Sequence, residues 1–120
     1  MPGCRNLVVG AAVKAEVVSA YRRVMPSLQH VAVGHPFYYG QCGGMLYAAA
    51  RFVPGEGVTA GELVNFQDEG ATMKFFARPA SGSWRRVGGE GFPASPKGCA
   101  EPGSNIPVAL ASLWGDCPDH

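Results

Sequence analysis

Residues 45–53 read MLYAAARFV, and this stretch decides the fold class. Its residues alternate between the two sides of an extended chain, so that one side carries Leu46, Ala48, Ala50 and Phe52. Alternation with a period of two predicts a strand that buries one face of a sheet. Three consecutive alanines leave a helix open as the alternative, because alanine has the highest helix propensity. The strand is the preferred interpretation, and it places a sheet at the centre of the fold.

A helix is predicted on the N-terminal side of this strand, over residues 11–24 (AAVKAEVVSAYRRV). Apolar residues such as Val13 and Val17 recur at helical spacing. Pro26 ends the pattern, because proline has no backbone N–H with which to continue a helix. Residues 35–39 (HPFYY) lie between helix and strand and are aromatic and extended in character.

Further strands are predicted beyond the central one. Residues 64–67 and 72–78 have strand character, with residues 68–70 (Asp-Glu-Gly) as the hairpin turn between them. Residues 83–87 (SWRRV) form a third strand of the same meander. Residues 59–62 (TAGE) have the spacing of a capping box, which starts a short helix or makes only a bend.

The C-terminal part is predicted to be a long loop followed by a short helix. Residues 88–104 are poor in regular structure, and Cys99 within them suggests that the loop is pinned. Ser104 or Asn105 is the expected helix cap, and residues 109–114 are the expected helix body.

Together these elements predict a single α+β domain over residues 1–120, a chain length close to the commonest domain size. An N-terminal amphipathic helix packs on an antiparallel sheet of four or five strands. The pinned loop, the short C-terminal helix and two disulfides complete the expected fold.

The composition argues against two classes of partner. The net charge is +1 and the basic residues are scattered, apart from the pairs at 22–23 and 85–86. A nucleic-acid surface needs clustered positive charge, so no nucleic-acid partner is expected. No apolar run approaches the ~20 residues that cross a bilayer, so no membrane span is expected.

Four cysteines, Cys4, Cys42, Cys99 and Cys117, allow three disulfide pairings. We prefer Cys4–Cys42 with Cys99–Cys117, because each of these bridges fixes a segment that is otherwise poorly held. The first anchors the N-terminus on the sheet, and the second ties the long loop to the end of the last helix. In the chain-entropy model they are worth about 4 and about 3 kcal/mol respectively.

Disulfides indicate an oxidising compartment, so the localisation is also inferred from the cysteines. The expected localisation is extracellular. No signal peptide follows Met1, so this expectation requires a mature chain from which the signal peptide has been removed. A cytosolic protein is the alternative.

An enzyme is the main alternative to a binding protein. The candidate is a small hydrolase or transferase with His35 as the base, with or without Cys42 as the nucleophile. The stretch GQCGGML, residues 40–46, resembles the sequence around the nucleophile of papain-like proteases, but Met45 stands in the place of the attacking cysteine. A structural half-cystine is therefore the preferred interpretation of Cys42, and no catalytic residue is assigned.

No metal site or cofactor is expected. The spacing of His30 and His35 matches no metal-binding motif, and His120 is the last residue. Asp68 and Glu69 are interpreted as solvated turn residues rather than as an acid–base pair.

The candidate binding residues are tyrosines and arginines, namely Tyr38, Tyr39, Tyr47, Arg51, Arg85 and Arg86. Tyrosine and arginine anchor protein interfaces, because each combines a large contact area with polar groups. Strand alternation predicts a sheet face that carries Tyr47, Arg51 and one of the two later arginines. The alternative without a binding function is that the aromatic rings lie in the core and the arginines keep the surface soluble.

Four patterns along the chain resemble small secreted proteins of actinobacteria of the Streptomyces type. The first is Tyr38-Tyr39 through Gly44 followed by Tyr-Ala-Ala-Ala-Arg-Phe over residues 47–52, and the second is Phe-Gln-Asp-x-Gly over residues 66–70. The third is a strand of Phe and Arg that leads to Gly-x-Trp, over residues 75–84. The fourth runs from Cys99 to Cys117 and contains Ile-Pro and Leu-Trp-Gly-x-Cys. The resemblance implies secretion, and it offers no activity or catalytic residues.

The function expected from the sequence is that of a secreted, non-enzymatic protein-binding module, such as an adaptor, an inhibitor or an accessory subunit. Its partner is expected to be another extracellular protein.

Overall fold

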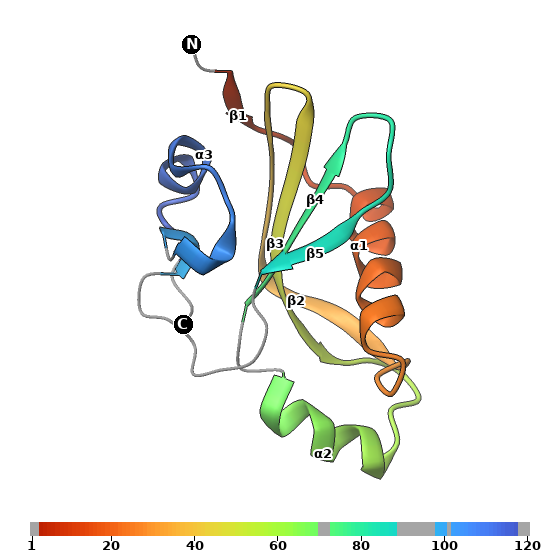
Figure 1. Cartoon of the computed structure of the whole chain (residues 1–120). Helices are drawn as coiled ribbons and strands as arrows, with labels where there is room; N and C mark the ends of the chain where they lie inside the picture. The colour runs from red at the N-terminus through yellow and green to blue at the C-terminus, as the bar shows by residue number, and fades with distance from the viewer. Residues whose placement is uncertain (1–2, 70–72, 89–97, 101, 118–120) are drawn as a thin grey trace.

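The computed structural model describes residues 3–69, 73–88, 98–100 and 102–117 (Figure 1). For residues 35, 66–69, 100 and 102 it describes the backbone only. Most of the predicted loop over residues 88–104 therefore lies outside the described residues, and Thr72 and His120 do so too.

A five-stranded antiparallel sheet forms the centre of the described structure, with the strands side by side in chain order. The strands are β1 (Cys4–Asn6), β2 (Val31–Cys42), β3 (Met45–Pro54), β4 (Lys74–Pro79) and β5 (Arg85–Gly88). The helices are α1 (Ala11–Val24), α2 (Ala60–Glu69) and α3 (Val108–Leu113), and two 3₁₀ turns are η1 (Gly98–Ala100) and η2 (Pro102–Ser104). The predicted α+β class with an antiparallel sheet is confirmed.

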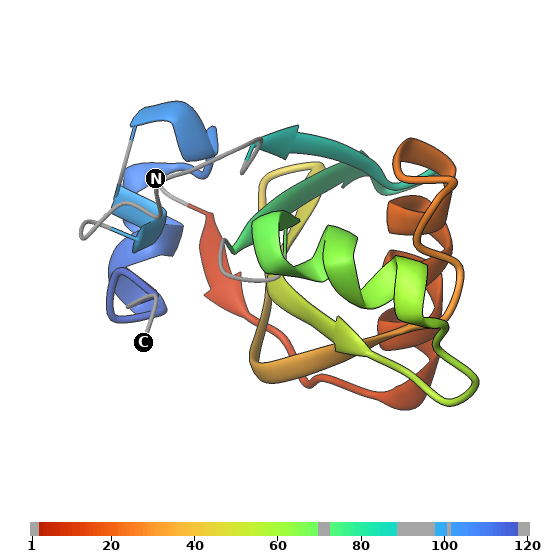
Figure 2. The ribbon, with the colours of Figure 1, turned by 90° about the horizontal axis from the view of Figure 1, so that it is seen from below.

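The described elements form three layers, with α1 on one side of the sheet and α3 with the 3₁₀ turns on the other (Figures 1 and 2). The strand over residues 45–53 is confirmed as the middle strand β3. Its alternation buries side chains on both faces: Ala48 and Phe52 pack under α1, whereas Ala49 packs under the C-terminal layer. Small alanine side chains allow both outer layers to approach the strand closely.

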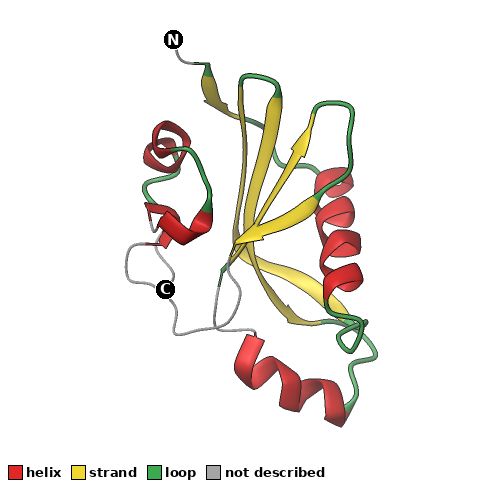
Figure 3. Ribbon diagram, in the orientation of Figure 1, coloured by secondary structure: helices red, strands yellow, loops and turns green. Residues whose placement is uncertain are grey.

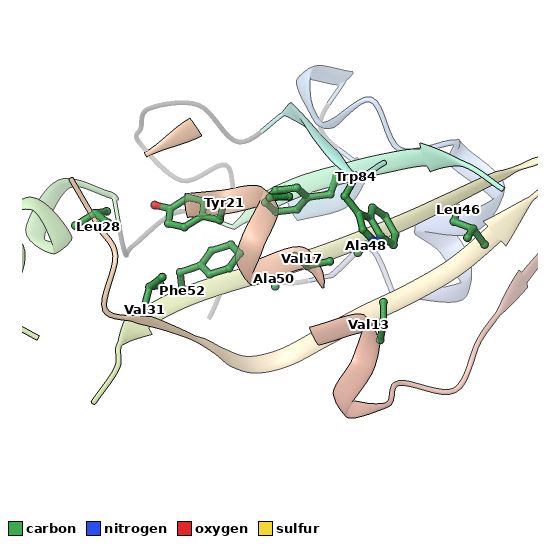
Figure 4. Close-up of a cluster of buried hydrophobic side chains, with 12 residues drawn as sticks. Val13, Val17, Tyr21, Leu28, Val31, Leu46, Ala48, Ala50, Phe52 and Trp84 are labelled. Atoms are coloured by element: carbon green, nitrogen blue, oxygen red, sulfur yellow. The ribbon is translucent and has the colours of Figure 1, made fainter. Parts of the chain in front are cut away.

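The helix predicted over residues 11–24 is confirmed as α1. Its inward side chains Val13, Val17 and Tyr21 are buried, as the helical spacing requires. The ring of Tyr21 stacks on that of Phe52, with ring centroids 4.0 Å apart (Figure 4). This stack joins helix to sheet at the centre of the larger core.

The predicted strand over residues 64–67 is wrong, because these residues belong to helix α2 (Figure 3). The predicted turn is wrong as well, since Asp68 and Glu69 are the last residues of that helix. The capping box supplies the physical reason. The Glu62 N–H donates to Thr59 Oγ1 at 3.2 Å, and the Thr59 N–H donates to Glu62 Oε1 at 2.9 Å, so a helix begins here.

Glu62 also ties α2 to the segment before β2. Its Oε2 accepts the backbone N–H groups of Gln29 at 2.9 Å and His30 at 3.1 Å, and its Oε1 lies 2.8 Å from His30 Nδ1. The backbone N–H groups of Thr59 and His30 are the main reason that the pKa of Glu62 falls from 4.5 to about 2.

Replacement of Glu62 by glutamine should change the acid dependence of stability. A carboxylate whose pKa is lower in the folded state stabilises the fold above the unfolded pKa of 4.5, and this contribution is lost as the pH falls towards about 2. Denaturant unfolding between pH 2 and pH 7 measures the free energy of unfolding. As the pH falls, this free energy should decrease less for Glu62→Gln than for the wild type. Glu56→Gln, which alters an exposed carboxylate of the preceding turn, is the control. Equal acid slopes in the wild type and Glu62→Gln would contradict this role.

The C-terminal layer is held on the sheet by a second apolar cluster. The buried side chains of Ile106, Leu110 and Trp114 pack with Met73 and Phe75, and the Cys99–Cys117 disulfide lies among them. The helix predicted over residues 109–114 is confirmed within one residue as α3. Ser104 does not cap it: its hydroxyl donates to Cys99 O at 2.8 Å and accepts from Ile106 N–H at 3.1 Å.

Replacement of Gly98 by alanine should loosen this layer. Gly98 has a φ of +55°, and a Cβ there would overlap the carbonyl oxygens of Asp116 and Cys117. We expect a loss of about 3 kcal/mol in the free energy of unfolding, from left-handed backbone strain together with steric overlap. Gly115, with a φ of +65° and open space around it, is the matched control, and Gly115→Ala should lose only about 1 kcal/mol. Equal losses in a denaturant titration would show that the overlap has no effect.

Candidate functional site

The four cysteines form two disulfides, Cys4–Cys42 and Cys99–Cys117, so the preferred pairing is confirmed. No cysteine is free. Because the Cys42 sulfur is bonded to Cys4, it is not available as a thiolate nucleophile. Cys4 and Cys42 lie directly opposite each other in the ladder between β1 and β2.

The six candidate binding residues are divided between the two faces of the sheet. Tyr47 and Arg85 both pair with Ala77, so they share the face that α3 covers in part. Tyr39 lies in a different cross-strand row, which ends at Arg86 and belongs to the α1 face. The predicted grouping of Tyr47 with one of the two arginines therefore selects Arg85.

Tyr38 and Arg51 lie on the same face as Tyr47. Both side chains are half-buried, and so is Tyr47, which packs against the C-terminal cluster. Burial raises the pKa of the Tyr38 phenol, and the nearby positive charge of Arg51 opposes this shift. Tyr38 therefore keeps its hydroxyl proton throughout the neutral range and can donate a hydrogen bond.

Tyr38 and Tyr39 help to line a groove of about 240 Å³ at the edge of the sheet. It lies where β1, β2 and the end of α3 meet, and we call it the aromatic groove. Its lining residues are Asn6, Leu7, Val9, Phe37, Tyr38, Tyr39, Leu113 and Trp114.

The walls of the aromatic groove are fixed by contacts between distant segments. The rings of Tyr38 and Trp114 lie 5.6 Å apart between centroids, tilted by 31°. Asn6 Nδ2 donates to Leu113 O at 3.5 Å, and Leu7 N–H donates to Tyr39 O at 2.9 Å. The Cys4–Cys42 disulfide holds the start of β1 against the end of β2. The groove is thus a built feature of the fold.

Two further details describe the aromatic groove and the strand edge beside it. The indole Nε1 of Trp114 is buried and has no hydrogen-bond partner among the described residues. In addition, β1 pairs only with residues 40–42 of β2. Residues 31–39 form the rest of that edge of β2, and no described strand lies beside them.

Sequence reasoning found Tyr38 and Tyr39 but missed Trp114, Leu113 and Asn6. The preferred cysteine pairing could have indicated Asn6, because a bond between Cys4 and Cys42 places the N-terminal segment beside β2. The position of Trp114, three residues before Cys117, gave no direct indication of where the C-terminal layer docks.

The other predicted candidates are only partly described. The backbone of His35 lies in β2, but its side chain is outside the described residues. His30 is paired with Glu62 at 2.8 Å. Within the described ranges, no three histidine, cysteine, aspartate or glutamate side chains gather in a way that would hold a metal ion.

Within the same described ranges, no helix has the length and apolarity needed to cross a bilayer. Searches of protein-family models, of curated proteins and of solved structures found no match to this chain.

Proposed function

We propose that the protein is an extracellular, non-enzymatic protein-binding module that takes an extended segment of its partner in the aromatic groove. The observation that carries this proposal is the lining of the groove, to which four aromatic residues contribute: Phe37, Tyr38, Tyr39 and Trp114. Two of their rings, those of Tyr38 and Trp114, lie 5.6 Å apart between centroids. Aromatic side chains dominate interface energetics, because they bury a large area at a small cost in conformational entropy.

The size of the aromatic groove favours an anchoring side chain over a whole small molecule. Its volume of about 240 Å³ lies below the roughly 300–1,000 Å³ of typical small-molecule sites. A peptide that extends the sheet beside residues 31–38 of β2 would gain main-chain hydrogen bonds and place apolar side chains in the groove. Arg51 and Arg85 lie on the face that continues from Tyr38, where they would select a partner with acidic residues.

The two disulfides support an extracellular location, because such bridges form and persist in oxidising compartments. The resemblance to small secreted actinobacterial proteins points the same way. Intact mass of protein from its native host, denatured with a thiol alkylator but without reductant, tests this location. We expect no alkylation, whereas four alkylated cysteines would contradict the proposed location.

Photo-crosslinking from the rim of the aromatic groove tests the binding function. Leu113 lines the groove and is 48% exposed, so a photoreactive phenylalanine analogue at this position should face a bound partner. Leu63 on α2 is 45% exposed and does not line the groove, which makes it the matched control. With extracellular proteins of the native host, we expect a discrete crosslinked species from position 113 and none from position 63. Equal crosslinking from both positions, or none from either, would contradict a specific site in the groove.

The second candidate function, predicted from the sequence, is that of an enzyme that uses His35. The side chain of His35 is outside the described residues and the Cys42 sulfur is bonded to Cys4, so no specific observation favours this enzyme over binding.

A further inference from the structure

A second hollow, of about 380 Å³, lies between α1 and the turn that joins β4 to β5. We call it the arginine cleft, and it shares no residue with the aromatic groove. Its polar lining includes Glu16, Ser19, Arg23, Arg78 and Ser83, and Trp84 also lines it.

The guanidinium of Arg78 is held in place by the turn. Its Nη1 donates to the carbonyl oxygens of Pro79 at 3.2 Å, Ala80 at 2.9 Å and Gly82 at 3.4 Å. Its Cζ lies 5.4 Å from the centre of the Trp84 ring, a cation–π distance. A cation fixed by backbone and ring contacts loses little further freedom when an anion binds.

The second guanidinium belongs to Arg23 at the end of α1. Its Nη2 donates to Trp84 O at 3.1 Å, and the Trp84 indole N–H in turn donates to Glu16 Oε1 at 3.0 Å. Both arginines thus meet at Trp84, one over its ring and the other at its carbonyl.

Among the described residues, neither Arg23 nor Arg78 has a carboxylate within the 4.0 Å of an ion pair. Two arginines against one glutamate leave the lining with an excess of positive charge. Uncompensated arginines in a hollow with hydroxyl groups are the chemistry that binds carboxylate and phosphate groups.

We propose that the arginine cleft binds the oxyanion of a small molecule, a carboxylate or a phosphate group, through Arg23 and Arg78. The hydroxyl groups of Ser19 and Ser83 supply additional donors to the ligand. The proposal is independent of the function assigned to the aromatic groove, since the two sites have no residue in common.

Titration of ¹⁵N-labelled protein with sodium phosphate and, separately, with sodium acetate tests the proposal, with sodium chloride at equal ionic strength as the reference. The Trp84 indole N–H should shift in a saturable manner, because Trp84 lines the cleft and its indole N–H donates to Glu16 Oε1 in the same lining. The indole N–H of Trp114, which belongs to the aromatic groove, is an internal control. Saturation with phosphate alone identifies a phosphate site, and saturation with acetate alone identifies a carboxylate site. Shifts no larger than those in sodium chloride would overturn the proposal.

Substitutions of opposite expected sign locate the anion in the cleft. Arg23→Gln should weaken binding about tenfold by removing a charge-assisted hydrogen bond. Glu16→Gln should tighten it several-fold by removing a like charge, a result that misfolding cannot imitate. Arg22→Gln is the matched control, because Arg22 donates from Nε to Gln29 O at 2.9 Å instead of lining the cleft. Unchanged affinity in both Arg23→Gln and Glu16→Gln would place any bound anion elsewhere and overturn the proposal.

Discussion

Replacement of Phe52 by alanine is expected to lower the free energy of unfolding by about 4 kcal/mol. Phe52 is only 2% exposed, and it lies in β3 directly beneath α1 (Figure 4). Its ring stacks on Tyr21 with an interplanar angle of 4° and meets the ring of Phe76 edge-on, at 5.9 Å between centroids. The substitution removes both ring contacts and leaves a cavity that the surrounding sheet cannot close.

Denaturant unfolding monitored by circular dichroism measures this loss. Val53→Ala is the matched control, because Val53 follows Phe52 in the same strand but is 40% exposed. This control should lose less than about 1 kcal/mol, as surface substitutions usually do. A loss below about 2 kcal/mol for Phe52→Ala would mean that the stack with Tyr21 is not the centre of the core.

Loss of the Cys4–Cys42 disulfide is expected to lower the free energy of unfolding about as much as Phe52→Ala does. It should also disturb the aromatic groove. The bridge spans 38 residues, for which the chain-entropy model gives about 4 kcal/mol. The strand that it anchors, β1, has only three residues, so few other contacts hold it on the sheet. A Cys4→Ser, Cys42→Ser double variant should therefore release the segment that carries Asn6 and Leu7 to the groove.

The Cys99→Ser, Cys117→Ser double variant provides the comparison. Its bridge spans 18 residues and should contribute about 3 kcal/mol. Hydrogen exchange should distinguish the two double variants. Removal of the first bridge should expose the backbone of β2 at residues 40–42, and removal of the second should expose the C-terminal layer. Retained protection at residues 40–42 without the first bridge would contradict its role in holding β1.

Features that depend on local periodicity were predictable from the sequence. The alternation over residues 45–53 corresponds to one strand, and the helical spacing of Val13 and Val17 corresponds to one helix with one buried face. That both faces of the strand bury side chains was not predictable from the alternation. The cysteine pairing was also predictable, because each bridge fixes an end of the chain.

The error over residues 64–67 shows where local pattern is insufficient. Residues 64–67 suggested a strand, yet they lie on α2, where the Val64 side chain is largely exposed. The capping interaction between Thr59 and Glu62 determines the start of this helix, and its strength depends on the backbone of Gln29 and His30, which are distant in sequence. A tertiary contact of this kind overrides strand propensity.

The candidate sites were only partly predictable, because each is assembled from separate segments. Tyr38 and Tyr39 could be selected as candidates because tyrosine is common at interfaces. The aromatic groove, however, is also lined by the segment after β1 and the end of α3. The arginine cleft needs the end of α1 beside the turn between β4 and β5. Arg23 and Arg78 were not singled out, since their proximity to Trp84 exists only in the folded chain.

The affinity of the partner crosslinked from position 113 is the most direct test of the binding function. We would compare Leu113→Glu with Leu63→Glu by isothermal titration calorimetry, since the two leucines have similar exposure and receive the same substitution. A charge at the rim of the aromatic groove should weaken binding at least tenfold, a loss of about 1.4 kcal/mol, and the same charge on α2 should leave the affinity unchanged. Equal affinities for wild type and Leu113→Glu would contradict the assignment of this groove as the binding site.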